Sequence, residues 1–332
     1  MKRRLVLAVL VVLALAATPL FATGQKEGAK AVAVEKAKKQ YNIGLVMKSL
    51  SNPAIKAIAD AAERKAAEMG VKLTVLSSQG FSALEEQIKQ VEDMINKKVD
   101  LIGIQCVDSK GVIPVINEAN KQGIPIITVD TGADGGKVVT YIATDNYAAG
   151  KQAAAWMIDE LEGRGKVAMI EGTPGSMQGR QRKDGFHEVL ATAKGIKLVT
   201  SIPANFERAK GMQVMEDIIT ANPDLNGVFC ANDEMALGAA EALRQRNLIG
   251  KVKLLGMNGA NDAMMAVWDG KLTGTVVQYS STHGDEFVRV AVQYLDGRKD
   301  WPAYMPLPTF VADKKLLFRL TEAFNLAPTA KK

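Results

Sequence analysis

Residues 41–76 read YNIGLVMKSLSNPAIKAIADAAERKAAEMGVKLTVL, an apolar run followed by a helical pattern and then a second apolar run. The helical pattern begins at Pro53, and its apolar residues recur at spacings of three and four. That spacing is typical of a helix with one buried face, Pro53 suits the first helical turn, and Gly70 suits a C-terminal cap. The stretch therefore predicts a strand–helix–strand unit.

The same alternation continues along the rest of the chain. Helical patterns begin near Asn146, Gln178, Glu207, Asp233 and Asn261, and the runs between them are rich in Val, Ile and Leu. Such strands alternating with helices indicate parallel sheets covered on both faces. A chain of this length exceeds a typical single domain, so we predict an α/β protein of two doubly wound lobes. Its further strands are predicted at 99–104, 124–129, 138–142, 166–170, 197–202, 227–230, 252–256 and 273–277.

The N-terminus has the order of regions found in a secretory signal peptide. Basic residues at 2–4 precede an apolar run at 5–17, and small residues follow around Ala22. The apolar run is too short to cross a bilayer of ~30 Å, and a permanent N-terminal anchor is the alternative. We predict a signal peptide over 1–22, a flexible leader over 23–40, and a soluble protein exported to the periplasm.

The net charge argues against a nucleic-acid-binding protein, and the positions of the two cysteines argue against a disulfide bridge. Removing 1–22 lowers the formal charge from +6 to +3, because that segment holds three basic residues and no acidic ones. A near-balanced surface gives no support to nucleic-acid binding, which requires a concentrated basic face. Cys106 and Cys230 fall in different predicted lobes, where a bridge would tie the lobes together, so we predict two free, buried thiols.

Polar side chains follow almost every predicted strand at its carboxyl end, which is where parallel sheets bind ligands. They are mostly amides and carboxylates, with one arginine, and such groups match the donating and accepting hydroxyls of a neutral polyol. A helix cap is the alternative for any one of them, as for Asn52, Asp145, Asp233 and Asn261. Their concentration favours a binding cleft.

Catalytic motifs are missing from the sequence. The two histidines, His187 and His283, lie far apart, and there is no HExxH pattern, no G-x-S-x-G elbow and no complete Walker A motif. The glycine-rich GTPGSMQG at 172–179 is interpreted as a tight turn, with a phosphate-binding loop as the alternative. We therefore predict a binding protein with no catalytic residues, no metal site and no cofactor.

Four segments together carry a resemblance to a known family: SNPAIKAIADAAERKAAEMG (51–70), IPIITVDTGADG (124–135), GRQRKDGF (179–186) and ANDEMALGA (231–239). They resemble the periplasmic ribose-type sugar-binding proteins, the extracytoplasmic receptors of ABC importers, over about 41–310. The resemblance implies the type I periplasmic binding fold, a monomer with two lobes joined by three crossovers. It also implies hinge closure on a monosaccharide or related polyol and delivery to an ABC-type membrane permease. The lobes would be 41–144 plus 279–308, and 145–278 plus 309–332.

The resemblance also implies a set of ligand contacts. In the family, an aspartate and an arginine, here placed at Asp130 and Arg180, grip sugar hydroxyls from opposite lobes. The full set carried over by position is Asn52, Gln105, Asp130, Arg180, Phe206, Asn232, Asn258 and Gln278.

This sequence departs from the ribose-binding members at several of the aligned positions. Ala54 and Ile55 replace two phenylalanines, Thr131 replaces an arginine, and Met257–Asn258 replaces a Phe-Asp pair. The resemblance therefore specifies the sugar or polyol class rather than ribose. Lys48 is interpreted as a surface ion-pair partner, with a contact to a ligand carboxylate as the alternative.

Two other functions are compatible with the fold class. An exported sugar-modifying enzyme would turn over the sugar that it binds. The effector domain of a lactose-repressor-type regulator would carry a basic helix-turn-helix at the N-terminus, where this chain has an export signal.

Overall fold

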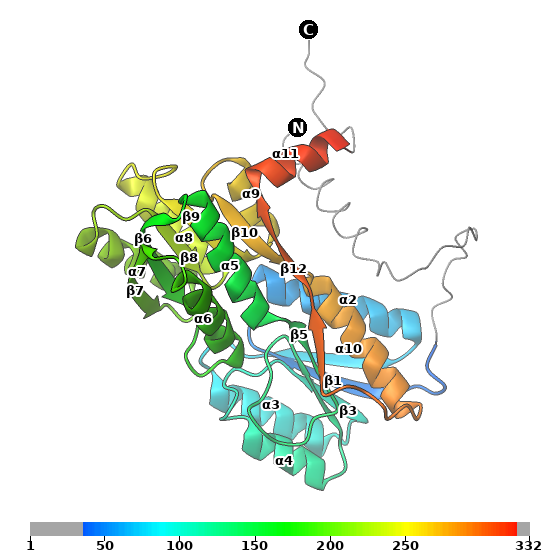
Figure 1. Ribbon diagram of the computed structural model, residues 1–332. Coiled ribbons are helices and arrows are strands. Elements are labelled where there is room, and N and C mark those ends of the chain that lie inside the picture. The colour runs from blue at the N-terminus through cyan, green and yellow to red at the C-terminus, as the bar shows by residue number, and fades with distance from the viewer. Residues whose placement is uncertain (1–35, 324–332) are drawn as a thin grey trace.

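The computed structural model describes residues 36–323 of the chain. The predicted signal peptide (1–22), most of the predicted leader and the last nine residues therefore lie outside the described part. Within it, the strands form two sheets of six strands each, with helices packed on their faces. The predicted fold class, two doubly wound α/β lobes, is confirmed (Figure 1).

The first sheet is entirely parallel and has the strand order β11-β5-β4-β3-β1-β2. Two core clusters lie on its two sides, one formed with α2 and α10 and the other with α3 and α4. Its elements are β1 (Asn42–Met47), α2 (Pro53–Met69), β2 (Lys72–Ser77), α3 (Leu84–Asn96), β3 (Leu101–Ile104), α4 (Ile113–Lys121), β4 (Ile126–Val129), β5 (Tyr141–Thr144), α10 (Ser280–Leu295) and β11 (Tyr304–Leu307).

The second sheet has the order β12-β10-β9-β8-β6-β7, and only β12 runs antiparallel to its neighbour. Helix α5 packs on α6, and α7 packs on α8. Its elements are α5 (Asn146–Glu160), β6 (Arg164–Glu171), α6 (Met177–Leu190), β7 (Gly195–Pro203), α7 (Arg208–Ala221), β8 (Gly227–Cys230), α8 (Asp233–Gln245), β9 (Lys253–Asn258), α9 (Asn261–Trp268), β10 (Gly274–Gln278), β12 (Thr309–Asp313) and α11 (Lys314–Ala323).

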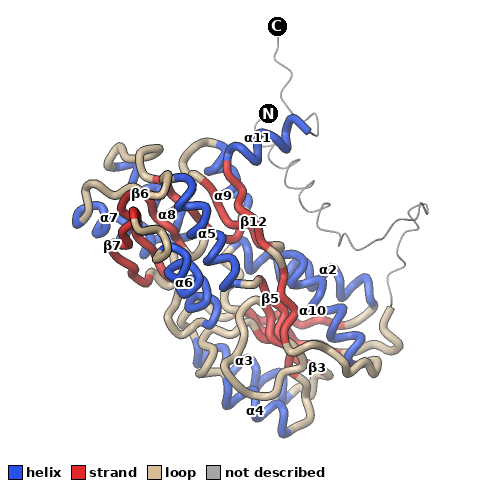
Figure 2. The backbone as a smooth tube through the Cα atoms, in the orientation of Figure 1, coloured by secondary structure: helices blue, strands red, loops and turns tan. Residues whose placement is uncertain are grey.

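The chain passes between the two sheets three times: from β5 to α5, from β10 to α10, and from β11 to β12. Figure 2 shows the strands gathered in two groups with the helices on their outer sides. Because of these crossings, each sheet takes strands from distant parts of the sequence.

The opening strand–helix–strand unit forms as its residues predict. The Asn52 side chain caps α2 by accepting hydrogen bonds from the N–H groups of Ala54 and Ile55, and Pro53 takes the first helical position. Gly70 ends the helix in the left-handed conformation, with φ of 75°, which glycine adopts without a steric penalty. The chain then turns into β2.

Helices α5 and α6 pack with their backbones in close contact. A Cβ atom on Gly150 of α5 would lie 2.2 Å from the carbonyl oxygen of Arg182, and one on Gly185 of α6 would lie 2.1 Å from that of Tyr147. Only glycine fits at these two crossing points. The close approach fixes the position of α6, which carries several side chains of the site described below.

Cys106 and Cys230 are both free and buried, as predicted. Among residues 36–323, none of the helices combines the length and the apolar character needed to cross a membrane.

Candidate ligand-binding cleft

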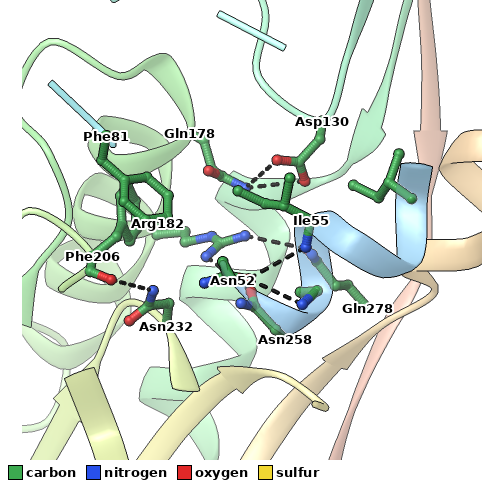
Figure 3. Close-up of a pocket in the computed structure, with 12 residues that line it drawn as sticks. Asn52, Ile55, Phe81, Asp130, Gln178, Arg182, Phe206, Asn232, Asn258 and Gln278 are labelled. Atoms are coloured by element: carbon green, nitrogen blue, oxygen red, sulfur yellow. Dashed lines mark hydrogen bonds between the residues drawn. The ribbon is translucent and has the colours of Figure 1, made fainter. Parts of the chain in front are cut away.

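A small cavity lies where the carboxyl ends of strands from both sheets meet (Figure 3). Six of the eight predicted ligand contacts line it, and Gln105 and Arg180 do not. The lining residues are Asn52, Ala54, Ile55, Ile58, Phe81, Asp130, Gln178, Arg182, Phe206, Asn232, Asn258 and Gln278.

Asp130 directly follows β4 and is only 3% exposed. Its Oδ2 accepts a hydrogen bond of 2.7 Å from Nε2 of Gln105, and both carboxylate oxygens lie 3.2 Å from Nε2 of Gln178. Gln178 belongs to α6, so it reaches Asp130 from the other lobe (Figure 3). Gln105 is completely buried and orients the carboxylate through this hydrogen bond, and it does not line the cavity.

The arginine that lines the cavity is Arg182, and the structure does not place Arg180 there. Arg180 lies at the rim, where its guanidinium forms a 2.6 Å ion pair with Asp134 and donates to the carbonyl of Gly175. Successive residues of an α-helix are rotated by about 100°, so side chains two apart on α6 point in nearly opposite directions. Arg182 therefore faces inward where Arg180 faces outward.

Arg182 is almost fully buried and is held by oxygen atoms from three elements. Its Nε donates to Asn146 of α5 at 2.9 Å, one terminal nitrogen donates to the carbonyl of Ala231 at 2.5 Å, and the other donates to Oε1 of Gln278 at 3.2 Å. Burial lowers its pKa to about 10, with Asp130 opposing the shift. The guanidinium therefore stays charged at neutral pH.

One side of the cavity is apolar. The ring of Phe206, from the loop before α7, packs 5.7 Å from the ring of Phe81, from the loop after β2 (Figure 3). Phe206 has φ of 64°, and a Cβ on Gly172 would lie 2.1 Å from its ring. Ile55 of α2 completes this wall. Two aromatic rings thus approach each other across the cleft.

Several of the polar residues predicted at strand ends cap helices in the structure. Asn52 caps α2, and Asn232 caps α8 while donating to the carbonyl of Phe206 at 3.0 Å, so both residues cap a helix and line the cavity. Asp145 caps α5, as its alternative interpretation held. Asp233 and Asn261 begin helices without being their N-caps.

Lys48 is buried rather than at the surface, so its interpretation as a surface ion-pair partner is wrong. Its Nζ donates to Oγ1 of Thr131 at 2.8 Å and lies 5.8 Å from the centre of the Phe206 ring. No carboxylate lies within ion-pair distance of it among the described residues. Burial lowers the pKa of Lys48 to about 8, although Asp130 acts in the opposite direction.

The glycine-rich segment 172–179 is a turn that contacts the first lobe. The backbone N–H of Ser109 donates to the carbonyl of Gly175 at 3.1 Å, and the Ser109 hydroxyl accepts from the N–H of Met177 at 2.9 Å. Together with the Arg180–Asp134 pair, these bonds join the two lobes around the cavity. The structure is therefore in a closed arrangement.

Sequence reasoning missed Phe81, Gln178 and Arg182. Gln178 and Arg182 lie within two residues of Arg180, which the resemblance predicted as a ligand contact. Phe81 lies beyond the carboxyl end of β2. A search for apolar as well as polar residues beyond the strand ends would identify Phe81 from the sequence. Across 36–323, no group of three or more His, Cys, Asp or Glu side chains is placed to hold a metal ion.

Comparison with known proteins identifies the family. The sequence profile of the periplasmic binding protein domain matches residues 43–299. The chain belongs to this family. Among relatives of this periplasmic binding protein, the ribose import binding protein of Bacillus subtilis is 37% identical over 263 residues, covering 79% of this chain and 84% of the relative. The D-allose-binding periplasmic protein of Escherichia coli is 32% identical, covering 75% and 82%.

Solved structures agree with this assignment. An ABC transporter periplasmic solute binding protein from Actinobacillus succinogenes with bound D-allose superposes with a TM-score of 0.80 at 33% identity, covering 84% of this chain and all of that chain. A solute binding protein from Bacillus halodurans with bound myo-inositol gives 0.79 at 26% identity, covering 87% and 98%. The resemblance found in the sequence is confirmed.

Proposed function

We propose that this protein captures a monosaccharide or related polyol outside the cytoplasmic membrane and delivers it to an ABC-type permease. The observation that carries the proposal is the cavity in which Asp130 and Arg182 come from opposite lobes and are surrounded by amides. A hydroxyl group both donates and accepts hydrogen bonds, and it can therefore bridge such a pair. The names of the relatives, which bind ribose or allose, support the same class of ligand.

Recognition would combine two kinds of contact. Asp130 would accept from ligand hydroxyls, and the amides of Asn232, Asn258 and Gln278 would donate and accept around the ring. The apolar wall of Phe81, Phe206 and Ile55 would cover the face of the ligand that carries C–H groups. Fixed polar groups that orient the ligand beside apolar side chains are typical of small-molecule sites.

Ligand capture would proceed by hinge closure. The moving units would be the predicted lobes, 41–144 plus 279–308 and 145–278 plus 309–332. A ligand that touches both lobes stabilises the closed state by its differential affinity for that state. We propose a monomer, because the cavity is completed by the two lobes of one chain.

Export would follow cleavage after Ala22, so that the mature protein begins near Thr23. N-terminal sequencing of protein recovered from outside the cytoplasmic membrane tests this, and retention of Met1 would contradict it. The relatives cited above are binding proteins, which gives no support to an exported sugar-modifying enzyme. Recovery of the bound sugar unchanged after prolonged incubation tests that point.

A thermal-shift screen of the mature protein tests the proposed ligand class. The panel contains pentoses, hexoses, polyols and sugar acids, each added in large excess. A ligand at a hundred times its Kd stabilises the folded state by about 2.7 kcal/mol, so a true ligand should raise the Tm by several degrees. A panel in which no neutral sugar or polyol raises the Tm would contradict the proposal.

A further inference from the structure

His283 lies near the start of α10, is completely buried, and has both ring nitrogens engaged. Its Nε2 is 3.0 Å from the backbone nitrogen of Thr144, and its Nδ1 is 3.0 Å from the carbonyl oxygen of Tyr279. A backbone N–H can only donate, so Nε2 must be the accepting nitrogen, and the proton must be on Nδ1, where it is donated to Tyr279. The geometry therefore requires the neutral imidazole.

The ring joins two of the three crossings between the lobes. Thr144 is the last residue of β5, where the chain first leaves the first sheet, and Tyr279 lies between β10 and α10, at the second crossing. The imidazole thus connects two backbone segments that are distant in sequence. His283 therefore connects two of the segments that form the hinge between the lobes.

The same link continues to the cleft. The Thr144 hydroxyl donates to Oε1 of Gln278 at 3.1 Å, and that oxygen also accepts from Arg182 at 3.2 Å. Gln278 and Arg182 both line the cavity (Figure 3). A continuous hydrogen-bonded path therefore runs from His283 through Thr144 to two groups that face the ligand space.

We propose that His283 is a positioning residue of the hinge: its neutral ring holds Thr144, and through Thr144 the Gln278 side chain, and protonation of the ring weakens ligand binding. The part that concerns binding rests on the proposed function, in which Gln278 contacts the ligand. A proton on Nε2 would set one N–H against another in a site closed to solvent. A buried donor without an acceptor is costly, so this contact would break.

The surrounding charges are compatible with a neutral ring. Burial lowers the pKa of His283, Asp130 at the end of β4 opposes the shift, and Arg182 of α6 adds to it. On α10 itself, Asp285 is paired with Arg64 of α2 at 2.8 Å. Acid would favour any arrangement that exposes the ring, so affinity should fall as the pH falls, and it should be fully retained at neutral pH.

The test uses the two histidines of the chain as a matched pair. In His283→Gln, the side-chain carbonyl can still accept from the Thr144 N–H but cannot take up a proton. His187→Gln is the control, because His187 lies on α6 and is bonded to the Ser201 hydroxyl at 3.0 Å, away from the hinge. Both variants are compared with the native protein from about pH 7.5 to about pH 4, because burial lowers the pKa of His283 below the ordinary histidine value of about 6.5.

The first measurement is made on ligand-free protein by NMR. The Thr144 backbone amide and the Gln278 side-chain amide should shift together as the pH falls in the native protein and in His187→Gln, and neither should shift in His283→Gln. Gln278 signals that stay constant while Thr144 titrates would overturn the inference. Should His283→Gln fail to fold, the coupled or uncoupled titration in the native protein still decides the question.

The second measurement is calorimetric titration with D-allose across the same pH range. The native protein and His187→Gln should lose about tenfold in affinity towards the acid end of this range, within the limit of tenfold per pH unit for one linked proton. His283→Gln should change by less than about twofold, and an equal loss in that variant would count against His283. Failure of D-allose to bind at any pH, with coupled NMR shifts, would reject this sugar and leave the hinge inference standing.

Discussion

Asp130 is held by two amides, one from each lobe, and its carboxylate is not fastened to its own loop. Its backbone has φ of 59°, in the left-handed region that aspartate and asparagine tolerate better than most residues. The sequence predicted its position, because it ends an apolar strand. It could not predict the partners, since Gln105 follows β3 in the same lobe, Gln178 lies on α6 of the other lobe, and no local pattern links them to Asp130.

We expect Asp130→Asn to weaken ligand binding by about 1.5–3 kcal/mol, or roughly ten- to a hundred-and-fifty-fold, because a hydrogen bond to a charged acceptor is lost. Asparagine keeps the shape and the positive φ, which makes it a better test than alanine. Calorimetric titration measures the affinity, and a melt of ligand-free protein measures the fold. Native affinity together with a lowered Tm would show that Asp130 only anchors the two amides.

The two arginines of α6 provide a second residue-scale test. Arg182→Gln should abolish measurable binding and also lower the Tm, because it leaves the Ala231 carbonyl and the Asn146 side chain without a buried partner. Arg180→Gln should change affinity by less than about fivefold, since its ion pair is partly exposed. Equal losses in the two variants, measured by the same titration, would contradict the placement of Arg182 in the cleft.

The lowered pKa of Lys48 should make the stability of the protein depend on pH in the alkaline range. Its pKa in the folded protein is about 8 against an ordinary 10.5, so between these values the unfolded chain holds a proton that the folded chain has released. The free energy of unfolding should therefore rise with pH across that window, by about 2–4 kcal/mol from this group. Urea unfolding of native protein and Lys48→Met at several pH values isolates the effect as their difference. Parallel curves for the two proteins would disprove it.

Helix α6 shows that an element can be predicted from the sequence while the face it turns towards the cavity is not. Its start near Gln178 was predicted, but its buried stripe includes Gln178, Gly179, Arg182 and Gly185 beside only two large apolar residues, Phe186 and Leu190. A hydrophobic period cannot be detected where polar and glycine residues form much of the inner face. The face that turns towards the cleft is therefore not predictable from the pattern, and the resemblance placed the contact at Arg180 rather than at Arg182.

The close crossing of α5 and α6 makes the stability of the protein sensitive to a substitution at Gly150. Gly150→Ala should lower the free energy of unfolding by about 1–3 kcal/mol through overpacking against the Arg182 carbonyl. In an open helix the same change stabilises by about 1 kcal/mol, so the sign itself is diagnostic. Gly80→Ala, with no atom within 4 Å of the added Cβ, is the control and should be near neutral in denaturant unfolding.

At the scale of the molecule, the alternation of strands and helices predicted the α/β class and the chain length predicted two sheets, but patterning did not predict β11 and β12. The segment 304–313 contains Pro306 and Pro308, which argue against a strand in a sheet interior. In the structure both strands are at sheet edges, where proline is tolerated. The assignment of residues 307 and 309 to different sheets depends on pairings across the whole chain, which local patterns do not encode.

Closure of the cleft is the prediction for the whole molecule. Contacts from both lobes should make the ligand-bound protein more compact than the ligand-free protein in solution. Small-angle scattering at saturating ligand should show a smaller radius of gyration, and the Asp130→Asn variant at the same ligand concentration should show less of the change. An unchanged radius at saturation would argue against a moving hinge.

The chain returns to its first lobe through α10 and β11, and this return also determines when the core of that lobe can be completed during synthesis. Phe287, Val288 and Ala291 of α10 belong to the same core cluster as Ile58 and Ala62 of α2. That cluster stays incomplete until a ribosome has made residues about 230 positions downstream of α2, and its apolar face is exposed until then. Contacts of such long sequence separation form slowly, because the loop-closure entropy must be overcome first. The first lobe can therefore complete its core only after α10 has been synthesised.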